Sequence, residues 1–264
     1  MNATKSTHIE ALILDMDGVL WRDDQPIGDL KAIFSRIHQQ GWMVTLATNN
    51  ATRSIEQYLN KLQRYGVSLN PEQIVNSSQA AVHFLSQSHP NGGNVYIIGE
   101  EGLLLTLSEY NFRHSLENPV AVIVGMDRDL TYKKLRQATL LIRAGIPFIG
   151  TNPDRTFPTP DGLVPGAGAI LAALEAATSV SPIIVGKPSP EMYLVALDRM
   201  GKKPAATLVV GDRLETDIAG AQKLGCPTAL VLSGVTSLQA AQSWNPSPDW
   251  IERDLASLLD RLKG

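Results

Sequence analysis

The chain has 264 residues, of which 44% are hydrophobic and 19% charged, a composition typical of a globular protein with one or two domains. Lys and Arg number 23 against 26 Asp and Glu, and the net charge of −3 argues against a nucleic-acid or anionic-membrane partner. The single cysteine, Cys226, excludes an intrachain disulfide, fits a reducing compartment and is expected to pack in a core. The polar N-terminus and the short apolar run after it predict a cytoplasmic protein without a signal peptide or membrane span.

The stretch from Ala11 to Leu20 predicts a buried strand that ends in two carboxylates. Four apolar residues lead into Asp15 and Asp17, and Gly18 then allows the backbone to turn sharply. In open α/β sheets, ligands bind at this end of the strands. Two adjacent carboxylates repel each other unless a proton or a cation lies between them, and oxygen ligands suit magnesium. The alternative is a strand end followed by solvated turn aspartates.

Residues 1–77 predict the start of a doubly wound fold, in which apolar strands alternate with amphipathic helices. After a polar loop at 21–26, which is either a flap or a connector, the expected elements are a helix from Leu30 to Gly41, a strand over 42–47, a helix from Ile55 to Gly66 and a strand at 74–75.

The pattern restarts over residues 78–181 and predicts an inserted α/β domain. Strands are expected over 95–98, 120–124 and 147–150, helices over 101–110, 131–144 and 167–177, and a loop over 151–165. Residues 182–264 then return to the first pattern. Strands are expected there over 182–185, 207–210 and 228–232, and helices over 191–200, 217–225 and 251–262. The predicted fold is therefore a Rossmann-like doubly wound parallel sheet (1–77 and 182–264) with an α/β insertion (78–181).

Polar side chains follow four of the predicted strands. They are Asp15 and Asp17, Thr48 and Asn49, Lys187, and Asp212 and Asp217. If these strands belong to one parallel sheet, the side chains meet in one crevice, where carboxylates, a hydroxyl and a cation suit phosphoryl transfer. Each group alone has a structural alternative, such as a turn, a helix cap or a surface lysine, but their joint occurrence favours a catalytic set.

These residues carry a family resemblance. The segments Asp15-Met16-Asp17-Gly18-Val19, Thr48-Asn49-Asn50, Gly186-Lys187-Pro188 and Gly211-Asp212-x-x-x-Thr216-Asp217 resemble the four ordered motifs of the haloacid dehalogenase (HAD) superfamily of phosphatases. Finer features resemble its NagD-like branch, which includes p-nitrophenyl phosphatases. They are Asn49-Asn50, Gly99-Glu100-Glu101-Gly102, Asp127-Arg128-x-Leu130-Thr131-Tyr132 and Thr151-Asn152-Pro153-Asp154. The resemblance covers nearly the whole chain.

The resemblance implies a role for each catalytic group. Asp15 would attack phosphorus and form an aspartyl-phosphate, and Asp17 would protonate the leaving oxygen and later activate water. Thr48 and the backbone N–H of Asn49 would hold the phosphoryl oxygens, while Lys187 would neutralise charge.

The same resemblance implies one metal ion and a further phosphate contact. Mg²⁺ would be bound by Asp15, the backbone carbonyl of Asp17 and Asp212. Backbone donors of the segment Arg213, Leu214, Glu215 and Thr216 would meet the phosphate. Asp217 would either orient the waters of the metal or cap its helix.

The insertion resembles a cap domain, which admits small substrates and excludes water. Residues of its loops are candidates for substrate selection: Asp127, Arg128, Asn152, Asp154 and Arg155. The alternative for these loops is local structure, with a helix start at Asp129 or Thr131 and a turn at Asn152-Pro153.

The expected activity is Mg²⁺-dependent hydrolysis of a small phosphorylated metabolite, and the cap is a possible surface for homo-oligomers. Two alternatives remain open: a phosphotransferase or mutase of the same superfamily, and a phosphate-binding protein without turnover. A dehalogenase is disfavoured, because an acid at Asp17 and a metal carboxylate at Asp212 serve phosphate chemistry.

Overall fold

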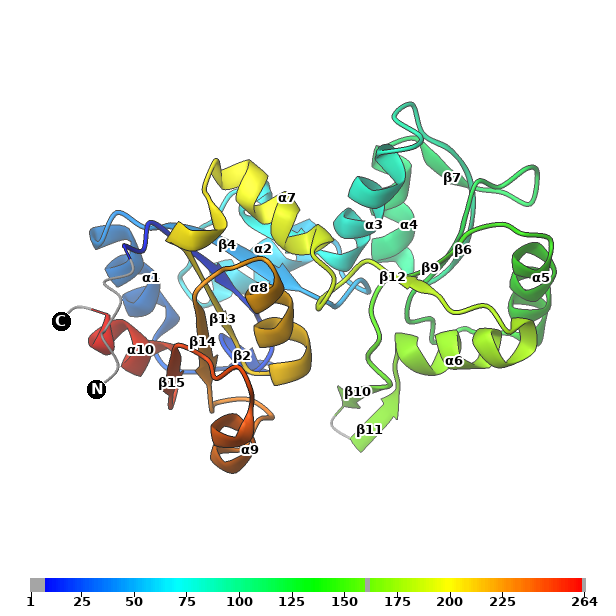
Figure 1. The fold of residues 1–264 in the computed structure, drawn as a ribbon. Coiled ribbons are helices and arrows are strands. Elements are labelled where there is room, and N and C mark those ends of the chain that lie inside the picture. The colour runs from blue at the N-terminus through cyan, green and yellow to red at the C-terminus, as the bar shows by residue number, and fades with distance from the viewer. Residues whose placement is uncertain (1–7, 160–161, 263–264) are drawn as a thin grey trace. The chain divides into compact units, whose positions relative to one another are not determined.

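The computed structural model of the protein describes residues 8–159 and 162–262. The chain forms two compact units (Figure 1). Among the described residues, the first unit contains those up to Thr48, residues 59–75 and residues 193–262, and the second contains residues 49–58, 76–159 and 162–192. The insertion boundaries at 78 and 181 stay a prediction, because compactness alone does not show where an insertion begins.

The first unit is built on a parallel sheet. Within the described part of the chain, six strands form it in the order β15-β14-β13-β1-β4-β5. Their bounds are β1 Ala11–Leu14, β4 Met43–Thr48, β5 Ile74–Asn76, β13 Thr207–Gly211, β14 Thr228–Val231 and β15 Trp250–Glu252. The strand order reverses between β1 and β13, which is the switch point where doubly wound sheets bind ligands. The doubly wound core predicted from the sequence is confirmed.

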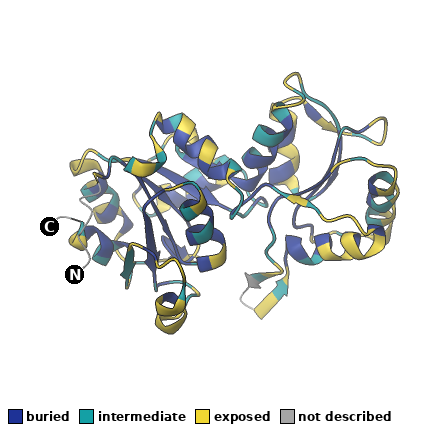
Figure 2. Cartoon of the chain, viewed as in Figure 1, coloured by how far each residue is buried: buried dark blue, intermediate teal, exposed yellow. Residues whose placement is uncertain are grey.

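Helices and a short hairpin complete this unit. Their bounds are the hairpin strands β2 Trp21–Arg22 and β3 Gln25–Pro26, then α1 Leu30–Gln39, α7 Glu191–Met200, α8 Ala219–Lys223, α9 Leu238–Ser243 and α10 Leu255–Arg261. Helix α2, Ile55–Arg64, contributes residues to both units, and the first two residues of α7 also belong to the second unit. Helix α1 packs on β4 and on α10, which in turn packs on β14 and β15. Figure 2 shows the central strands β1 and β13 as buried, which follows from their continuous apolar runs, whereas the edge strand β15 is half-buried.

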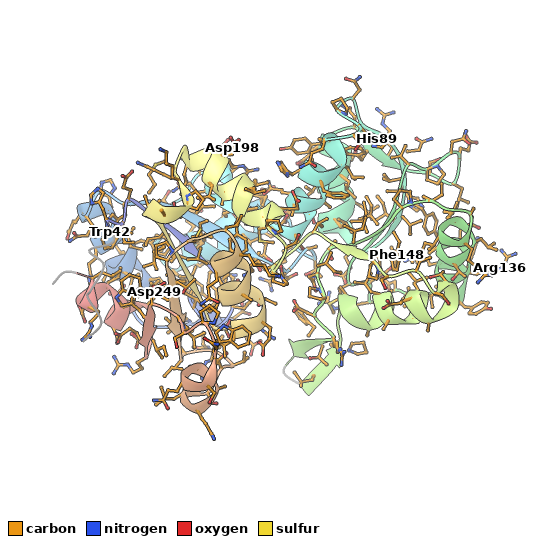
Figure 3. All side chains as sticks on the ribbon, viewed as in Figure 1. Trp42, His89, Arg136, Phe148, Asp198 and Asp249 are labelled. Atoms are coloured by element: carbon orange, nitrogen blue, oxygen red, sulfur yellow. The ribbon has the colours of Figure 1, made fainter. Side chains whose placement is uncertain are left out.

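The second unit has its own parallel sheet, in the order β12-β9-β8-β6-β7. Its strands are β6 Gly93–Ile98, β7 Phe112–His114, β8 Val122–Val124, β9 Phe148–Gly150 and β12 Ile183–Ile184, and its helices are α3 Ser77–Ser86, α4 Glu101–Glu109, α5 Tyr132–Arg143 and α6 Ala167–Thr178. Helices α5 and α6 cover one face of this sheet, with Phe148, Ile142 and Leu171 in one buried cluster. Figure 3 shows Phe148 on β9 and Arg136 on α5. Each large apolar side chain buried there stabilises the fold by about 1.5–3 kcal/mol.

Four local predictions need correction. The loop predicted over 151–165 contains an antiparallel hairpin, with β10 at Thr156–Thr159 and β11 at Gly162–Pro165. The helix predicted over 251–262 is a strand followed by a shorter helix, because Trp250 and Ile251 pair with β14 and Asp254 caps α10. The helix predicted from residue 217 begins earlier, with a π-turn over Leu214–Ile218 before α8.

The fourth correction concerns the strand predicted over 182–185. It belongs to the sheet of the second unit and pairs with β9, with Ile183 opposite Ile149 and Ile184 opposite Gly150. Helix α3 carried no clear sequence signal, because its small residues are buried on several sides and lack an amphipathic period. None of the helices within residues 8–159 and 162–262 is long and apolar enough to cross a membrane.

Cys226 is buried, as expected for a packing residue, with 5% of its surface exposed. Burial raises the pKa of its thiol to about 12. At pH 8 the reactive thiolate is therefore roughly a thousandfold rarer than for an exposed cysteine. We expect an aromatic disulfide reagent to label the native protein slowly and the guanidinium-unfolded protein quickly, as measured by absorbance of the released thiolate. Fast stoichiometric labelling of the native protein would contradict the burial of this thiol.

Candidate active site

The carboxyl ends of β1, β4 and β13 place three of the predicted residues at one edge of the first sheet. Leu14, the last residue of β1, lies opposite Leu46 of β4 and Val210 of β13 in parallel register. The next residue, Asp15, donates its backbone N–H to the carbonyl of Val210 at 2.9 Å. Because the strands run parallel, Thr48 and Asp212 end or follow their strands at the same edge.

The side chains of Asp15, Asp212 and Asp217 form a buried acidic cluster. Each offers one carboxylate oxygen, and these oxygens lie within 4.8 Å of one another. Two unit charges at that separation repel by about 3 kcal/mol at an effective dielectric constant of about 20. Three oxygen donors this close suit a hard divalent cation, which would remove the repulsion. The donor set therefore fits magnesium.

The Asp212 carboxylate is held by backbone contacts that were not predicted from the sequence. Its Oδ2 accepts a hydrogen bond from the N–H of Val235 at 2.9 Å. Gly18 and Gly234 border the same oxygen, and a Cβ at Gly18 would lie 2.5 Å from it. The signal for this loop was the Ser233-Gly234 pair directly after the predicted strand at 228–232.

The role of Asp217, either orienting the waters of a metal or capping its helix, stays a prediction. This residue belongs to the acidic cluster, and its Oδ2 also accepts the backbone N–H of Arg213 at 3.0 Å, which orders the turn after β13. The hydroxyl of Tyr193 donates to the carbonyls of Thr216 and Asp217 at 3.1 and 3.0 Å and so fixes this segment from α7. Gly211 leaves no room for a Cβ beside the Asp217 side chain.

The side chains of residues 213–216, the segment predicted to bind phosphate, differ in how far they are buried. Leu214 packs in an apolar cluster with Ile218 and Leu230, and Thr216 is buried, whereas Glu215 is exposed. The backbone N–H of Arg213 already donates to Asp217. The side chain of Leu214 therefore serves packing, and the phosphate role of this segment stays a prediction about its backbone.

Asp17 is exposed, and its Oδ1 accepts a hydrogen bond from the indole N–H of Trp21 at 2.9 Å. The indole itself is buried, with 1% exposure. The sequence predicts a loop over residues 21–26 without this contact. The available signal was the spacing, because a turn at Gly18 brings the fourth residue after Asp17 back toward it.

Asn49 and Lys187 lie together in the second unit. The Asn49 side chain accepts the backbone N–H of Lys187 at 2.8 Å and donates to its carbonyl at 3.0 Å. Lys187 is 3% exposed, which makes it no ordinary surface lysine. It does not follow a strand of the first sheet, so the expectation that four strands of one sheet carry the set was wrong at this position. The short β12 pairs with β9 instead, and the Asn49 side chain fixes the backbone of Lys187.

The loop at 127–128 is organised largely by its own ion pairs. The Asp127 carboxylate accepts the ammonium of Lys134 at 2.7 Å and the N–H of Asp129 at 2.9 Å. The Arg128 guanidinium binds both carboxylate oxygens of Glu100 at 2.9 and 2.7 Å. Thr131 caps α5, so the structural alternative holds for the start of this helix.

The loop at 152–155 contacts the asparagine motif. The Asn152 side chain donates to the carbonyl of Asn49 at 2.8 Å and accepts the N–H of Asp154 at 3.1 Å, which is the predicted turn. Asp154 in turn accepts the Asn49 side chain at 3.5 Å. Arg155 is exposed.

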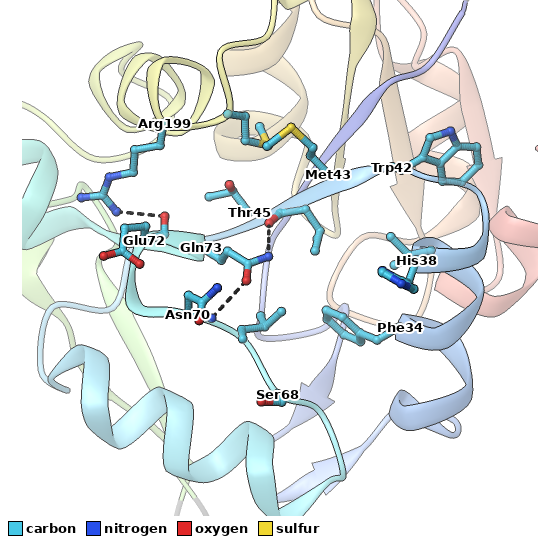
Figure 4. A pocket seen from close by; sticks show the side chains of 14 residues that line it. Phe34, His38, Trp42, Met43, Thr45, Ser68, Asn70, Glu72, Gln73 and Arg199 are labelled. Carbon is cyan, nitrogen blue, oxygen red and sulfur yellow. Dashed lines mark hydrogen bonds between the residues drawn. The ribbon is translucent and has the colours of Figure 1, made fainter.

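A cavity of about 510 Å³ lies at the other end of the first sheet (Figure 4). It is lined by Phe34 and His38 of α1, by Trp42 and Met43 at the start of β4, and by Arg199 of α7, among others. None of the predicted site residues lines this cavity. The residues that line it lie before a strand or at its start, whereas the acidic cluster follows the strand ends.

Comparisons with known proteins show which family this chain resembles. A profile of the haloacid dehalogenase-like hydrolase family matches residues 12–113, and a HAD-hydrolase-like profile matches residues 184–258. The acid sugar phosphatase of Staphylococcus aureus is 34% identical over 255 residues, which are 96% of this chain and 98% of that protein.

Solved structures extend the likeness to three dimensions. NagD from Escherichia coli K-12 superposes with a TM-score of 0.88 at 33% identity, over 94% of this chain and 97% of that one. A glycerol phosphate phosphatase of Mycobacterium tuberculosis in complex with magnesium gives a TM-score of 0.88 at 35% identity, over 95% and 76% of the two chains.

Proposed function

Because the chain belongs to the NagD-like branch of the haloacid dehalogenase superfamily of phosphatases, we propose that it hydrolyses small phosphate monoesters with magnesium through an aspartyl-phosphate on Asp15. The observation that carries the proposal is the buried cluster of Asp15, Asp212 and Asp217, whose carboxylate oxygens lie within 4.8 Å of one another. A nucleophile beside two further carboxylates can face a phosphate dianion only with a cation present.

In the first half of the reaction, a carboxylate oxygen of Asp15 attacks phosphorus and the bond between phosphorus and the ester oxygen breaks. Asp17 gives its proton to that oxygen, so the product leaves as a neutral alcohol and an aspartyl-phosphate remains. Asp17 is exposed and Asp15 is buried, so the two carboxylates lie in different environments, as two separate roles require.

In the second half, Asp17 is a carboxylate and takes a proton from water. The water oxygen attacks phosphorus, the bond to the Asp15 oxygen breaks, and inorganic phosphate leaves. Both aspartates are then in their starting states, which lets the cycle repeat.

Asp15, Asp212 and the backbone carbonyl of Asp17 would hold Mg²⁺, with Asp217 beside them. When bound, the ion supplies positive charge to the phosphoryl oxygens. Thr48 and the backbone N–H of Asn49 would bind phosphoryl oxygens, and the ammonium of Lys187 would offset their charge. Two hydrogen bonds between the Asn49 side chain and the Lys187 backbone fix the position of this lysine and so support its role.

We place the substrate among small sugar and polyol phosphates. The names of the relatives support this class, since one is an acid sugar phosphatase and another a glycerol phosphate phosphatase. Arg155 and Asp154 are the cap-loop candidates for substrate selection. Asp127 and Arg128 are weaker ones, because their charges are paired with Lys134 and Glu100.

The proposal is tested by phosphate release from p-nitrophenyl phosphate and from a panel of sugar and polyol phosphates, with Mg²⁺ and with a chelator. We expect release that depends on Mg²⁺ and falls by at least about 100-fold in chelator, because the acidic cluster is left without its counterion. Restoration by Mg²⁺ after dialysis is the control for irreversible damage.

The outcomes separate the alternatives. Transfer of phosphate to a second alcohol without net release would indicate a phosphotransferase or mutase. Binding of phosphate esters by folded protein without release or transfer would indicate a binding protein, and either result would overturn the hydrolase proposal.

A further inference from the structure

The hairpin of residues 21–26, here called the Trp21 hairpin, places one buried donor against Asp17. The indole N–H of Trp21 donates to Asp17 Oδ1 at 2.9 Å. Trp21 is 1% exposed, whereas Asp17 is exposed. A rigid ring in the core therefore holds a carboxylate that otherwise sits toward solvent.

Contacts from three residues in two other segments anchor the Trp21 hairpin. The ammonium of Lys61 in α2 donates to the carbonyl of Asp23 at 2.5 Å and lies 4.3 Å from the centre of the Trp21 ring. The hydroxyl of Tyr65 donates to the carbonyl of Asp24 at 2.8 Å. The guanidinium of Arg22 donates to the carbonyl of Ser233, whose own hydroxyl donates to Gly18.

The burial of Lys61 is informative, because placing an ammonium in a protein interior is costly unless it is well compensated. Lys61 is 3% exposed, and its ion pair with Asp24 spans 3.3 Å. The Lys61 ammonium therefore interacts with Asp23 and Asp24 of the hairpin and with the face of the Trp21 ring. The hairpin is therefore a fixed support next to Asp17 rather than a loose connector.

We propose that Trp21 is a positioning residue, which holds the Asp17 carboxylate for proton transfer to and from the reacting oxygen. The inference rests on the proposed function, because it assigns Asp17 the acid and base roles. An indole N–H can only donate, so Oδ1 is kept as an acceptor. The transferred proton is then carried by Oδ2, in an orientation that the ring fixes.

The competing explanation is purely structural. A buried indole N–H needs an acceptor, and Asp17 would provide it without any consequence for catalysis. The two explanations differ in how the loss of the N–H depends on the leaving group. An alkoxide leaves poorly without a proton, whereas p-nitrophenolate leaves without one, so imprecise proton donation slows only the alkyl ester.

The test compares wild type and Trp21→Phe on p-nitrophenyl phosphate and on the alkyl phosphate that wild type hydrolyses fastest. Phenylalanine keeps an aromatic ring and removes the N–H donor. The kcat/KM values report the step in which the leaving group departs. We expect kcat/KM to fall on the order of tenfold for the alkyl ester and less than about twofold for the aryl ester, a part of the 10²–10⁴ typical of general acid catalysis.

Two variants serve as references. Trp42→Phe makes the same chemical change at the residue that precedes β4 (Figure 3). Asp17 follows the carboxyl end of the parallel neighbour β1, at the opposite edge of the sheet, so this variant should leave both kcat/KM values unchanged. Asp17→Asn removes the proton donor itself and should show the same dependence on the leaving group with a larger loss. Thermal unfolding of each variant separates a loss of structure from a loss of positioning.

Equal losses with both esters in a folded Trp21→Phe protein, or no loss with either, would overturn the positioning role. Should Trp21→Phe not fold, Tyr65→Phe decides, because it removes a half-buried anchor of the hairpin and should also slow the alkyl ester selectively. Without that selectivity the inference fails. Wild type that hydrolyses neither ester would instead refute the proposed function.

Discussion

Replacing Asp15 with asparagine should lower kcat/KM for phosphate release by roughly 10⁴-fold or more, because an amide does not attack phosphorus. The amide has nearly the same volume as the carboxylate, and the backbone N–H of Asp15 remains bonded to Val210. The protein should therefore stay folded. After acid quenching of a reaction with labelled ester, wild-type protein should carry phosphate that hydroxylamine releases, and Asp15→Asn should carry none.

Asp198→Asn is the matched control, since it makes the same change of charge on an exposed residue of α7 (Figure 3). Its activity should equal that of wild type, and its preparation should show any contaminating phosphatase. If purified Asp15→Asn kept about a tenth of the activity, another group would be the nucleophile, and the covalent mechanism would be wrong.

Gly18→Ala should raise the Mg²⁺ concentration needed for half-maximal activity by about 10- to 100-fold, the usual effect of disturbing groups that orient metal ligands. Gly18 has φ of +82°, and a Cβ there would lie 2.5 Å from Oδ2 of Asp212 and 3.0 Å from the Cα of Gly234. We expect relief of that overlap to displace the Asp212 carboxylate, which belongs to the acidic cluster. Mg²⁺ titrations of phosphate release and of binding by calorimetry measure the effect.

The chain offers a control that has the same backbone strain without the overlap. Gly41 has φ of +70°, and no atom lies within 4 Å of a Cβ built on it. Gly41→Ala should cost about 1–2 kcal/mol of stability, as a left-handed alanine does, with an unchanged Mg²⁺ requirement. An equal Mg²⁺ requirement in the two variants would show that Gly18 serves the backbone turn alone.

Much of the first unit was predictable because local patterns and tertiary structure agree there. A buried central strand needs a continuous apolar run, and β1 and β13 have such runs directly before Asp15 and Asp212. The reversal of strand order beside β1 then brings these two residues to one edge. Elements with weak or short patterns, such as α3 and β15, were missed or misread because pairing and burial stabilise them more than local preference does.

In the candidate site, too, some features were predictable from the sequence and others were not. Asp217 was recognised as a residue near the site, but only the π-turn after β13 shows that its carboxylate reaches the acidic cluster. Lys187 was expected to follow a strand of the first sheet, whereas its strand pairs with β9. Contacts between segments distant in the sequence determine which strands pair, so the sheet to which a two-residue strand belongs cannot be predicted from that strand's sequence.

The sequence by itself determined the strand ends that carry Asp15 and Asp212 and the sharp turn at Gly18, because apolar runs and glycine act within a few residues. Only the tertiary structure decided that Val235 donates to Asp212 and that Lys61 supports the ring against Asp17. Those contacts join residues 23 and more positions apart, and they exist because folding buries polar groups that must then find partners.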